Sequence, residues 1–167
     1  MQVLFVDLTG FSAYTERHGE RAAAELASSF AMKAMQVGRR AGLRPVKTVG
    51  DAVIFVTSEA ERAARGAMAL LEAFDGTRSP FSVHIGLAAG EVIERDDDVF
   101  GFPVNMAAHL SAAARPGQVL IDNAVAQDLP RKLFGVVDAG TRRMKGLSKT
   151  VRLFDLLKRS RIGEVPS

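Results

Sequence analysis

The sequence predicts a mixed α+β fold from three observations. Short apolar runs rich in β-branched residues are separated by longer segments with helical periodicity. Turns that contain Gly, Pro or Asp connect them. Their order is strand, helix, strand, strand, helix, strand. This βαββαβ order is typical of a ferredoxin-like split βαβ core, with an antiparallel sheet and helices on one face. Strand and helix additions are expected at the C-terminal end.

The first half of the chain supplies two strand–helix units. Its predicted elements are strands at residues 3–8, 44–48 and 52–57 and helices at residues 12–41 and 58–74. Gly19 predicts a bend near the start of the long helix, and Gly42 predicts its end. Ser58 and Glu61 match a capping box for the second helix.

The second half contains shorter elements. Its predicted elements are strands at residues 83–88, 119–121, 134–139 and 151–156 and helices at residues 103–114 and 123–129. Residues 91–94 are a candidate extension of the strand at 83–88, and residues 95–98 are read as a charged loop. We expect one domain over residues 1–157 and a basic, poorly ordered C-terminal tail over residues 158–167.

Composition narrows the function classes. The chain has 167 residues, 47% of them apolar and 25% charged, as in a soluble globular domain. It contains no Cys, which excludes disulfides, thiolate metal sites and cysteine nucleophiles. A net charge of +3 is too small to indicate nucleic-acid binding. No apolar run is long enough to cross a bilayer, and the N-terminus lacks signal-peptide features, so we expect a cytoplasmic protein.

Two carboxylates follow strand ends in the first half of the chain. Asp7 precedes a Gly-containing turn into a helix, and Asp51 lies in the turn between the next two strands. Taken singly, each is better explained as a turn or capping residue. In a split βαβ core these strand ends are adjacent, so we expect the two carboxylates to meet and form a metal site. The N–H groups of the turn after Asp7 and the helix dipole favour an anion.

A third polar group lies near the predicted helix at 103–114. Asp98 precedes this helix, and Asn105 and His109 are four residues apart and therefore share one of its faces. Asn is a poor helix former, so its presence at position 105, within a predicted helix, needs an explanation. The structural alternatives are a local hydrogen bond or an exposed position for Asn105, and a packed or solvent-facing position for His109.

Together these segments resemble the catalytic domain of the class III nucleotide cyclases, the adenylate and guanylate cyclases. The resemblance covers about residues 2–157, in the order and spacing of the family. It is carried by Asp7, Gly10 and Phe11; by Lys47, Thr48, Gly50 and Asp51; by Gly86, Gly90, Glu91 and Val92; by Asp98, Val99, Gly101, Val104, Asn105, Ala107 and Ala108; by Pro116, Gly117, Gln118 and Val119; and by Met144, Lys145, Gly146 and Leu147.

The resemblance implies an adenylate cyclase, a phosphorus–oxygen lyase that converts ATP to 3′,5′-cyclic AMP and pyrophosphate in signal transduction. Asp7 and Asp51 would hold two divalent cations, Mg²⁺ or Mn²⁺. One ion would activate the ribose 3′-hydroxyl for attack on the α-phosphate, and the other would bind the triphosphate. Lys47 and Asp98 would recognise adenine, because Lys donates to N1 and Asp accepts from the N6 amine.

The remaining roles that the resemblance implies concern the phosphates, the ribose and the subunit arrangement. The turn of Thr9, Gly10 and Phe11 would bind phosphate, as would Lys145, and Asn105 would orient the ribose. In the family, metal and base residues come from different subunits. The resemblance therefore implies a homodimer with two shared sites and ATP as substrate. No nucleic-acid partner and no membrane segment in this chain are expected.

The sequence departs from the family at His109, where most active members have an Arg that stabilises the transition state. A His with a pKa near 6.5 is only partly charged at neutral pH and has fewer donors than a guanidinium. The alternative is thus a cyclase-like nucleotide-binding or dimerisation module with weak or no turnover. A third hypothesis is another phosphoryl-transfer enzyme on this fold, such as a palm-type polymerase or a diguanylate cyclase.

Overall fold

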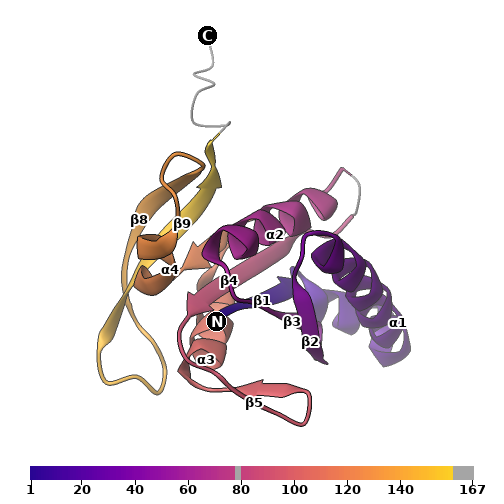
Figure 1. Cartoon of the computed structure of the whole chain (residues 1–167). Helices are drawn as coiled ribbons and strands as arrows, with labels where there is room; N and C mark the ends of the chain where they lie inside the picture. Colours follow the sequence, from indigo (N-terminus) through magenta and orange to yellow (C-terminus); the bar gives the residue numbers. More distant parts are fainter. Residues whose placement is uncertain (78–79, 160–167) are drawn as a thin grey trace.

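The computed structural model of the chain describes residues 1–77 and 80–159 (Figure 1). Its strands are β1 (Gln2–Leu8), β2 (Arg44–Val49), β3 (Ala52–Thr57), β4 (Val83–Ala89), β5 (Ile93–Arg95), β6 (Asp98–Phe100), β7 (Val119–Ile121), β8 (Phe134–Arg143) and β9 (Thr150–Lys158). Its helices are α1 (Phe11–Arg40), α2 (Ala60–Ala73), α3 (Phe102–Ala113) and α4 (Asn123–Asp128). The predicted α+β fold is confirmed.

Seven strands form one sheet, in the order β2-β3-β1-β4-β7-β9-β8. The order of the first four is that of a split βαβ core, with β1 antiparallel to both β3 and β4. The predicted sheet was antiparallel throughout, but β7 runs parallel to β4. The cause is α3, which crosses from the end of β4 back to the start of β7 and so makes a parallel pair possible.

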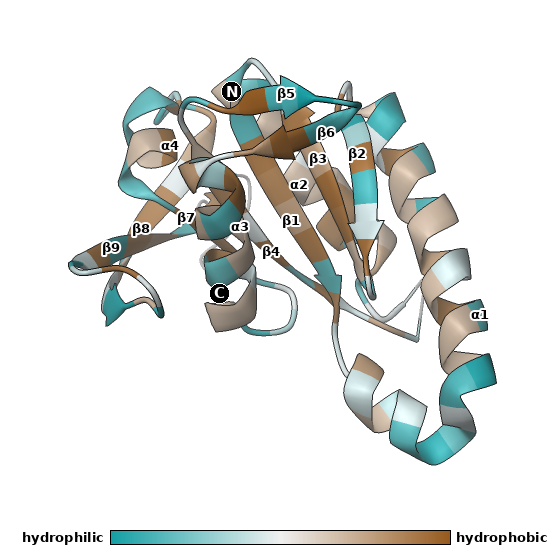
Figure 2. Cartoon of the chain, turned by 90° about the horizontal axis from the view of Figure 1, so that it is seen from below, coloured by the Kyte–Doolittle hydropathy of each residue, from teal (hydrophilic) through white to brown (hydrophobic). Residues whose placement is uncertain are grey.

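Helices cover both faces of the sheet, which corrects the prediction that they lie on one face (Figures 1 and 2). On the first face, α1, α2 and α4 pack against β-strand side chains that include Leu4, Val53 and Phe55. On the second, α3 contributes Met106 and Leu110 to a smaller apolar cluster. We call these the α1/α2 face and the α3 face.

Contact between α3 and the sheet is close at Gly86 in β4. A Cβ atom at this position would lie 2.0 Å from the Ala107 carbonyl oxygen and 2.4 Å from the Ser111 nitrogen, both backbone atoms of α3. Only a glycine permits this approach, which sets the height of α3 above the strands.

The predictions near the starts of α1 and α2 had different outcomes. Gly19 has φ 86° and ψ 169° inside α1, so the predicted bend is confirmed. The predicted capping box at Ser58 is wrong. Glu59 is the N-cap of α2 and no side chain caps this helix, so the first-turn N–H groups depend on other partners.

The segment after β4 forms a separate two-stranded hairpin, β5–β6, rather than an extension of β4. Asp96 and Asp97 lie at its turn with φ of 52° and 61°. This left-handed pair matches the twist of a two-residue hairpin turn, and Asp tolerates it better than most residues. The hairpin lies beside β2, the edge strand of the main sheet (Figure 2).

The end of the predicted domain falls within β9, which reaches Lys158. Most of the predicted tail, residues 160–167, lies outside the described residues. No helix in the described part of the chain is both long enough and apolar enough to span a membrane.

Candidate active site

Asp7 and Asp51 lie close together where β1 ends and β3 begins, as predicted. We call this end of the inner strands the carboxylate edge of the sheet. Asp7 is the penultimate residue of β1 and pairs with Ala52 of β3, which follows Asp51 directly. The Leu8 N–H donates to the Asp51 carbonyl oxygen at 3.4 Å, which ties the β2–β3 turn to the end of β1. The side chain of Asp51 lies close enough to Asp7 to favour the protonated form of the Asp7 carboxyl.

The environment of Asp7 disfavours its charged form. Burial, followed by the hydrogen bond and the negative charge of Asp51, raises the pKa of Asp7 from 3.8 to about 7. Asp7 Oδ1 is buried and, among the described residues, has no hydrogen-bond partner. An unsatisfied buried oxygen is costly, and a ligand of opposite charge would satisfy it.

A divalent cation fits this edge. Carboxylate oxygens are the ligands that Mg²⁺ and Mn²⁺ prefer, and Mg²⁺ usually takes one or two protein carboxylates plus phosphate and water. Asp7 and Asp51 provide such a pair, with Asp7 Oδ1 still free to bind. Within residues 1–77 and 80–159 no cluster of three or more His, Asp or Glu side chains is placed to hold a metal ion.

His84 also lies beside Asp7, although none of the sequence motifs includes it. It is the residue of β4 directly opposite Asp7, and its Nε2 lies 3.9 Å from Asp7 Oδ2. Its Nδ1 lies 2.7 Å from the Ser111 carbonyl oxygen at the end of α3. Because a carbonyl only accepts, Nδ1 carries the proton and Nε2 faces the carboxylates. A lone polar residue between the apolar Val83 and Ile85 was the available signal.

The turn after Asp7 leads into α1 with its N–H groups uncapped. Gly10 is the N-cap of α1 with φ 77°, and this residue provides no side-chain cap for the first-turn N–H groups. The Thr9 N–H donates to the Ser82 carbonyl oxygen at 3.0 Å, whereas the buried Thr9 Oγ1 has no partner among the described residues. Thr9, Gly10 and Phe11 thus lie beside the carboxylate pair.

Lys47 and Asp98 form the second pair that the structure brings together. Lys47 Nζ donates to Asp98 Oδ2 at 2.7 Å, and the Val99 N–H donates to Asp98 Oδ1 at 2.7 Å. The hydrogen bond from Lys47 and that from the Val99 N–H hold the pKa of Asp98 below its ordinary value. Lys47 Nζ also lies 6.0 Å from the centre of the Phe100 ring.

A β-bulge decides which way Lys47 points. The pairing of β2 with β3 shifts between Pro45, opposite Phe55, and Lys47, opposite Ile54, so Val46 is an extra residue. Phe55 belongs to the α1/α2 face and Ile54 to the α3 face. Without the extra residue Lys47 would pair one position further on and point to the opposite face. The bulge therefore turns Lys47 toward Asp98.

Asn105, His109 and Lys145 lie apart from both pairs. Asn105 is exposed and His109 is partly buried, on a face of α3 different from that of the buried Ser111. Lys145 is exposed in the loop between β8 and β9, directly after the buried Met144. In the described part of the chain, none of these three side chains makes a hydrogen bond or ion pair with Asp7, Asp51, Lys47 or Asp98.

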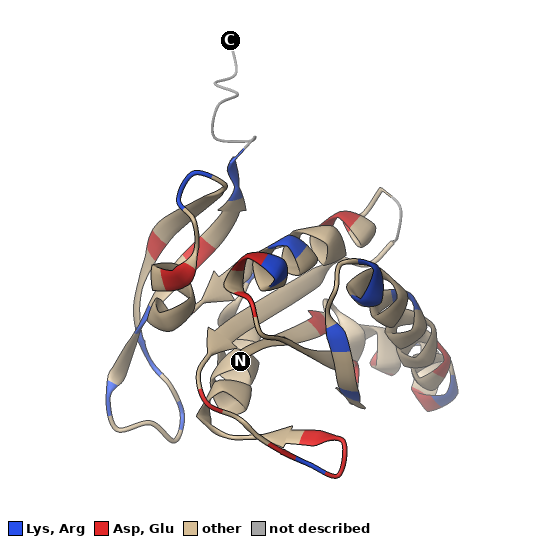
Figure 3. Ribbon diagram, in the orientation of Figure 1, with Lys and Arg blue, Asp and Glu red and all other residues tan. Residues whose placement is uncertain are grey.

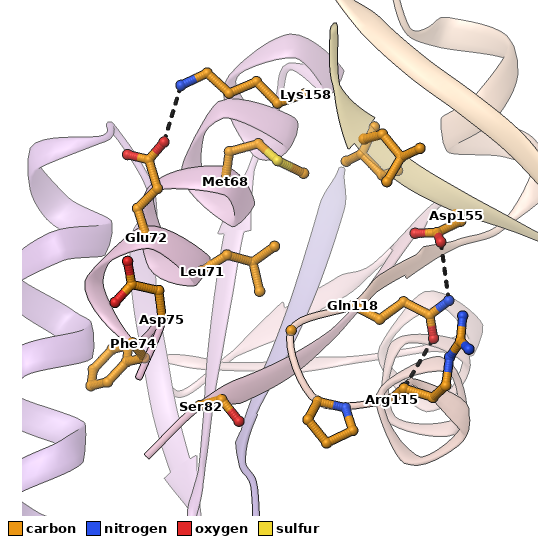
Figure 4. A pocket seen from close by; sticks show the side chains of 14 residues that line it. Met68, Leu71, Glu72, Phe74, Asp75, Ser82, Arg115, Gln118, Asp155 and Lys158 are labelled. Atoms are coloured by element: carbon orange, nitrogen blue, oxygen red, sulfur yellow. Dashed lines mark hydrogen bonds and ion pairs between the residues drawn. The ribbon is translucent and has the colours of Figure 1, made fainter. Parts of the chain in front are cut away.

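A cavity of about 910 Å³ lies elsewhere, lined by the C-terminal half of α2, the segment between α3 and β7, and β9 (Figure 4). Gln118 Nε2 donates to Asp155 Oδ2 at 3.2 Å on one side, and Lys158 Nζ donates to Glu72 Oε1 at 3.0 Å on the other. The cavity contains none of the predicted site residues, although Pro116, Gly117 and Gln118 of the sequence motifs line it.

Comparison with known proteins shows the family of this chain. The family model for the adenylate and guanylate cyclase catalytic domain matches residues 1–158. The chain belongs to this family. An adenylate cyclase of Streptomyces griseus is 38% identical over 130 residues, 78% of this chain and 33% of that protein. An uncharacterised protein of Mycobacterium tuberculosis is 35% identical over 165 residues, 98% of this chain and 43% of that protein.

The cyclase domain also resembles solved structures. The adenylyl cyclase CyaB from P. aeruginosa matches with a TM-score of 0.74 and 21% identity, over 94% of this chain and 93% of that one. At this identity the likeness confirms the fold. The cyclase domain spans less than half the length of the curated relatives given above.

Proposed function

We propose that this cyclase domain is an adenylate cyclase that converts ATP to 3′,5′-cyclic AMP and pyrophosphate, with the two active sites of a homodimer shared between its copies. The contact between Asp7 and Asp51, with one buried oxygen left unsatisfied, carries the proposal. Such a pair is suited to holding Mg²⁺ or Mn²⁺ against a triphosphate. The adenylate cyclase name of the S. griseus relative supports the product.

In this proposal the carboxylates act by charge and position. Divalent cations held by Asp7 and Asp51 would lower the pKa of the ribose 3′-hydroxyl and neutralise part of the triphosphate charge. Asp7 and Asp51 would hold the cations as carboxylates at the ends of their strands, so Asp7 would bind them in its deprotonated form. The uncapped N–H groups after Gly10 face the anionic phosphates. Positioning and charge neutralisation supply most of the acceleration in phosphoryl transfer.

Lys47 and Asp98 support ATP rather than GTP as the substrate. An ammonium beside a carboxylate offers a donor to adenine N1 and an acceptor to the N6 amine, and guanine presents the reverse pattern. The two groups lie 2.7 Å apart, so they already have the spacing of neighbouring hydrogen-bonding positions on a base edge. A mismatched base would leave both groups unpaired, which is the stronger source of discrimination.

The homodimer is proposed on the family resemblance and on surface character. Ile93, Phe100 and Phe102, which are 65%, 49% and 56% exposed, lie on the β5–β6 hairpin and at the start of α3. Exposed apolar side chains of this size are typical of interaction surfaces. In the dimer, Asp7 and Asp51 of one copy would face Lys47, Asp98 and Lys145 of the other, and Asn105 would orient the ribose.

Cyclic AMP formation from ATP tests the proposal, with Mn²⁺ or Mg²⁺ and at several protein concentrations. The D51A variant serves as the blank. We expect specific activity to rise with protein concentration, because two copies complete each site, and to vanish in the blank. ATP binding without any cyclic AMP would contradict the proposal and favour the nucleotide-binding module. A linear product from ATP would favour a different phosphoryl-transfer enzyme.

A further inference from the structure

The β5–β6 hairpin carries Asp98 but is weakly anchored. It lies outside the seven-stranded sheet, and all three residues of β5 are exposed. In β6 only Val99 is buried, at 2% exposure, in the cluster of the α3 face. One apolar side chain can hold the hairpin near the body but leaves its orientation free. Polar contacts must therefore set where Asp98 points.

Two ion pairs connect this hairpin to β2. Arg44 Nη2 pairs with Glu94 Oε1 from β5, and Lys47 Nζ pairs with Asp98 Oδ2 from β6. Arg44 lies opposite Val56 and Lys47 opposite Ile54, so both basic residues are on the α3 face of β2. One cation of β2 thus meets each strand of the hairpin.

The charge of the hairpin makes this pairing selective. Residues 91–98 contain five carboxylates and one guanidinium (Figure 3). Lys47 could attract any of the nearby acids, since an ammonium is a point charge without strong directional preference. Arg44 pairs with Glu94 of β5, so Glu94 does not compete for the ammonium of Lys47. Lys47 therefore pairs with Asp98.

We propose that Arg44 and Glu94 are positioning residues for nucleotide recognition, because their ion pair fixes the hairpin so that Asp98 stays paired with Lys47. The inference rests on the proposed function, in which Lys47 and Asp98 read the base. Loss of the Arg44–Glu94 pair loosens the hairpin that carries Asp98, and where Glu94 is retained it competes with Asp98 for Lys47. The consequence is a loss of preference for adenine over guanine, with the metal-binding edge left intact.

The test measures kcat/KM for ATP and for GTP in the R44E and E94R variants and in the double variant that carries both changes. Each single variant should reduce the ATP-to-GTP ratio by about two- to fivefold, the scale of a partly exposed ion pair. The loss should appear mainly in KM for ATP. The double variant restores the pair in reverse and should restore the ratio. High ionic strength should shrink the difference between single variants and wild type.

A matched control separates this effect from a change in overall charge. Glu61 and Arg65 form an exposed ion pair on α2, at 44% and 58% exposure, on the other face of the sheet. Reversing either charge should leave the ATP-to-GTP ratio unchanged. The same ratio, measured from the Kd values of non-cyclisable ATP and GTP analogues, tests the inference independently of turnover.

The outcomes distinguish the inference from the proposed function. Wild-type protein that forms no cyclic AMP overturns the proposed function, and the analogue Kd ratio then decides the inference. An unchanged ratio in R44E and E94R, or a double variant that does not restore it, overturns the inference. Equal shifts in the α2 controls also overturn it, because they would show a general effect of surface charge.

Discussion

The two faces of the sheet have different chemistry. On the α1/α2 face the buried cluster is apolar throughout, from Leu4 and Phe55 to Leu156. The α3 face has a smaller apolar cluster, and around it lie Asp7, His84, Lys47 and Asp98. The larger apolar cluster lies on the first face, whereas residues of the candidate site gather on the second.

The α3 face itself contains two contrasting pairs. Asp7 and Asp51 are like charges held together in a partly buried place, which raises the pKa of Asp7. Lys47 and Asp98 are opposite charges that satisfy each other, which lowers the pKa of Asp98. The first pair is satisfied only by an added cation, whereas a substrate must replace part of the second pair.

The largest effect is expected at the like-charged pair. Asp51→Asn removes one oxygen anion from the proposed metal site, and we expect cyclic AMP formation to fall by about 10³-fold, equivalent to ~4 kcal/mol of transition-state stabilisation. The melting temperature should not fall, because the repulsion is relieved. Asp128→Asn, an exposed carboxylate on α4, is the control and should retain activity. Retained activity in Asp51→Asn would remove it from the metal site.

Close packing on the α3 face predicts the next effect. In Gly86→Ala the new Cβ would meet backbone atoms of α3, and overpacking of this kind costs about 1–3 kcal/mol. Gly66→Ala is the matched variant on α2, where the Cβ would meet only side-chain atoms of Leu43 and Ala is the better helix former. Urea unfolding should show the larger loss for Gly86→Ala. An equal or larger loss for Gly66→Ala would contradict the difference between the faces.

The opposite-charged pair should control base preference. Replacing it with Lys47→Gln and Asp98→Asn together should lower the ATP-to-GTP ratio of kcat/KM by about 10- to 100-fold, because hydrogen bonds to charged groups contribute about 1.5–3 kcal/mol. Divalent-cation binding, followed by calorimetry with Mn²⁺, should be unchanged. If the nucleotide ratio does not move, these residues do not read the base.

Metal-free protein should lose stability as pH rises. The pKa of Asp7 is about 7 in the folded protein, against 3.8 for an Asp without neighbouring groups, as in the unfolded chain. The folded protein therefore binds this proton more tightly than the unfolded chain does. The stabilising contribution is complete below pH about 4 and is lost by pH about 7. Melting temperatures in a chelator should fall across this range, and Asp7→Asn should flatten the curve. A steep fall that persists in Asp7→Asn would point to another group.

The smallest effect is expected at His109. If it occupies the transition-state position, His109→Arg supplies a permanent charge and more donors, and kcat should rise by about tenfold, equivalent to ~1.4 kcal/mol. Ala112→Arg, an exposed position on the same helix, is the control for added charge. An unchanged or lower kcat in His109→Arg would mean that this domain uses His109 differently.

Periodicity and turn chemistry were sufficient for most of the fold. The buried run of β3, the bend at Gly19 and the short helix at 123–128 follow from patterns within a few residues of each other. The β5–β6 hairpin was missed because its strands are short and exposed, so they show no alternation. The parallel β4–β7 pair was missed because it depends on α3 packing on the second face.

The positions of the two carboxylates of the candidate site follow from local sequence. Asp7 lies near the end of β1 and Asp51 directly before β3, and a split βαβ core brings these strand ends together. The direction of Lys47 depends instead on a bulge in the β2–β3 pairing, which sets the face on which its side chain lies. Strand pairing and packing place His84 opposite Asp7 and Arg44 beside Glu94. Such contacts depend on register and on long-range pairing, which local spacing does not encode.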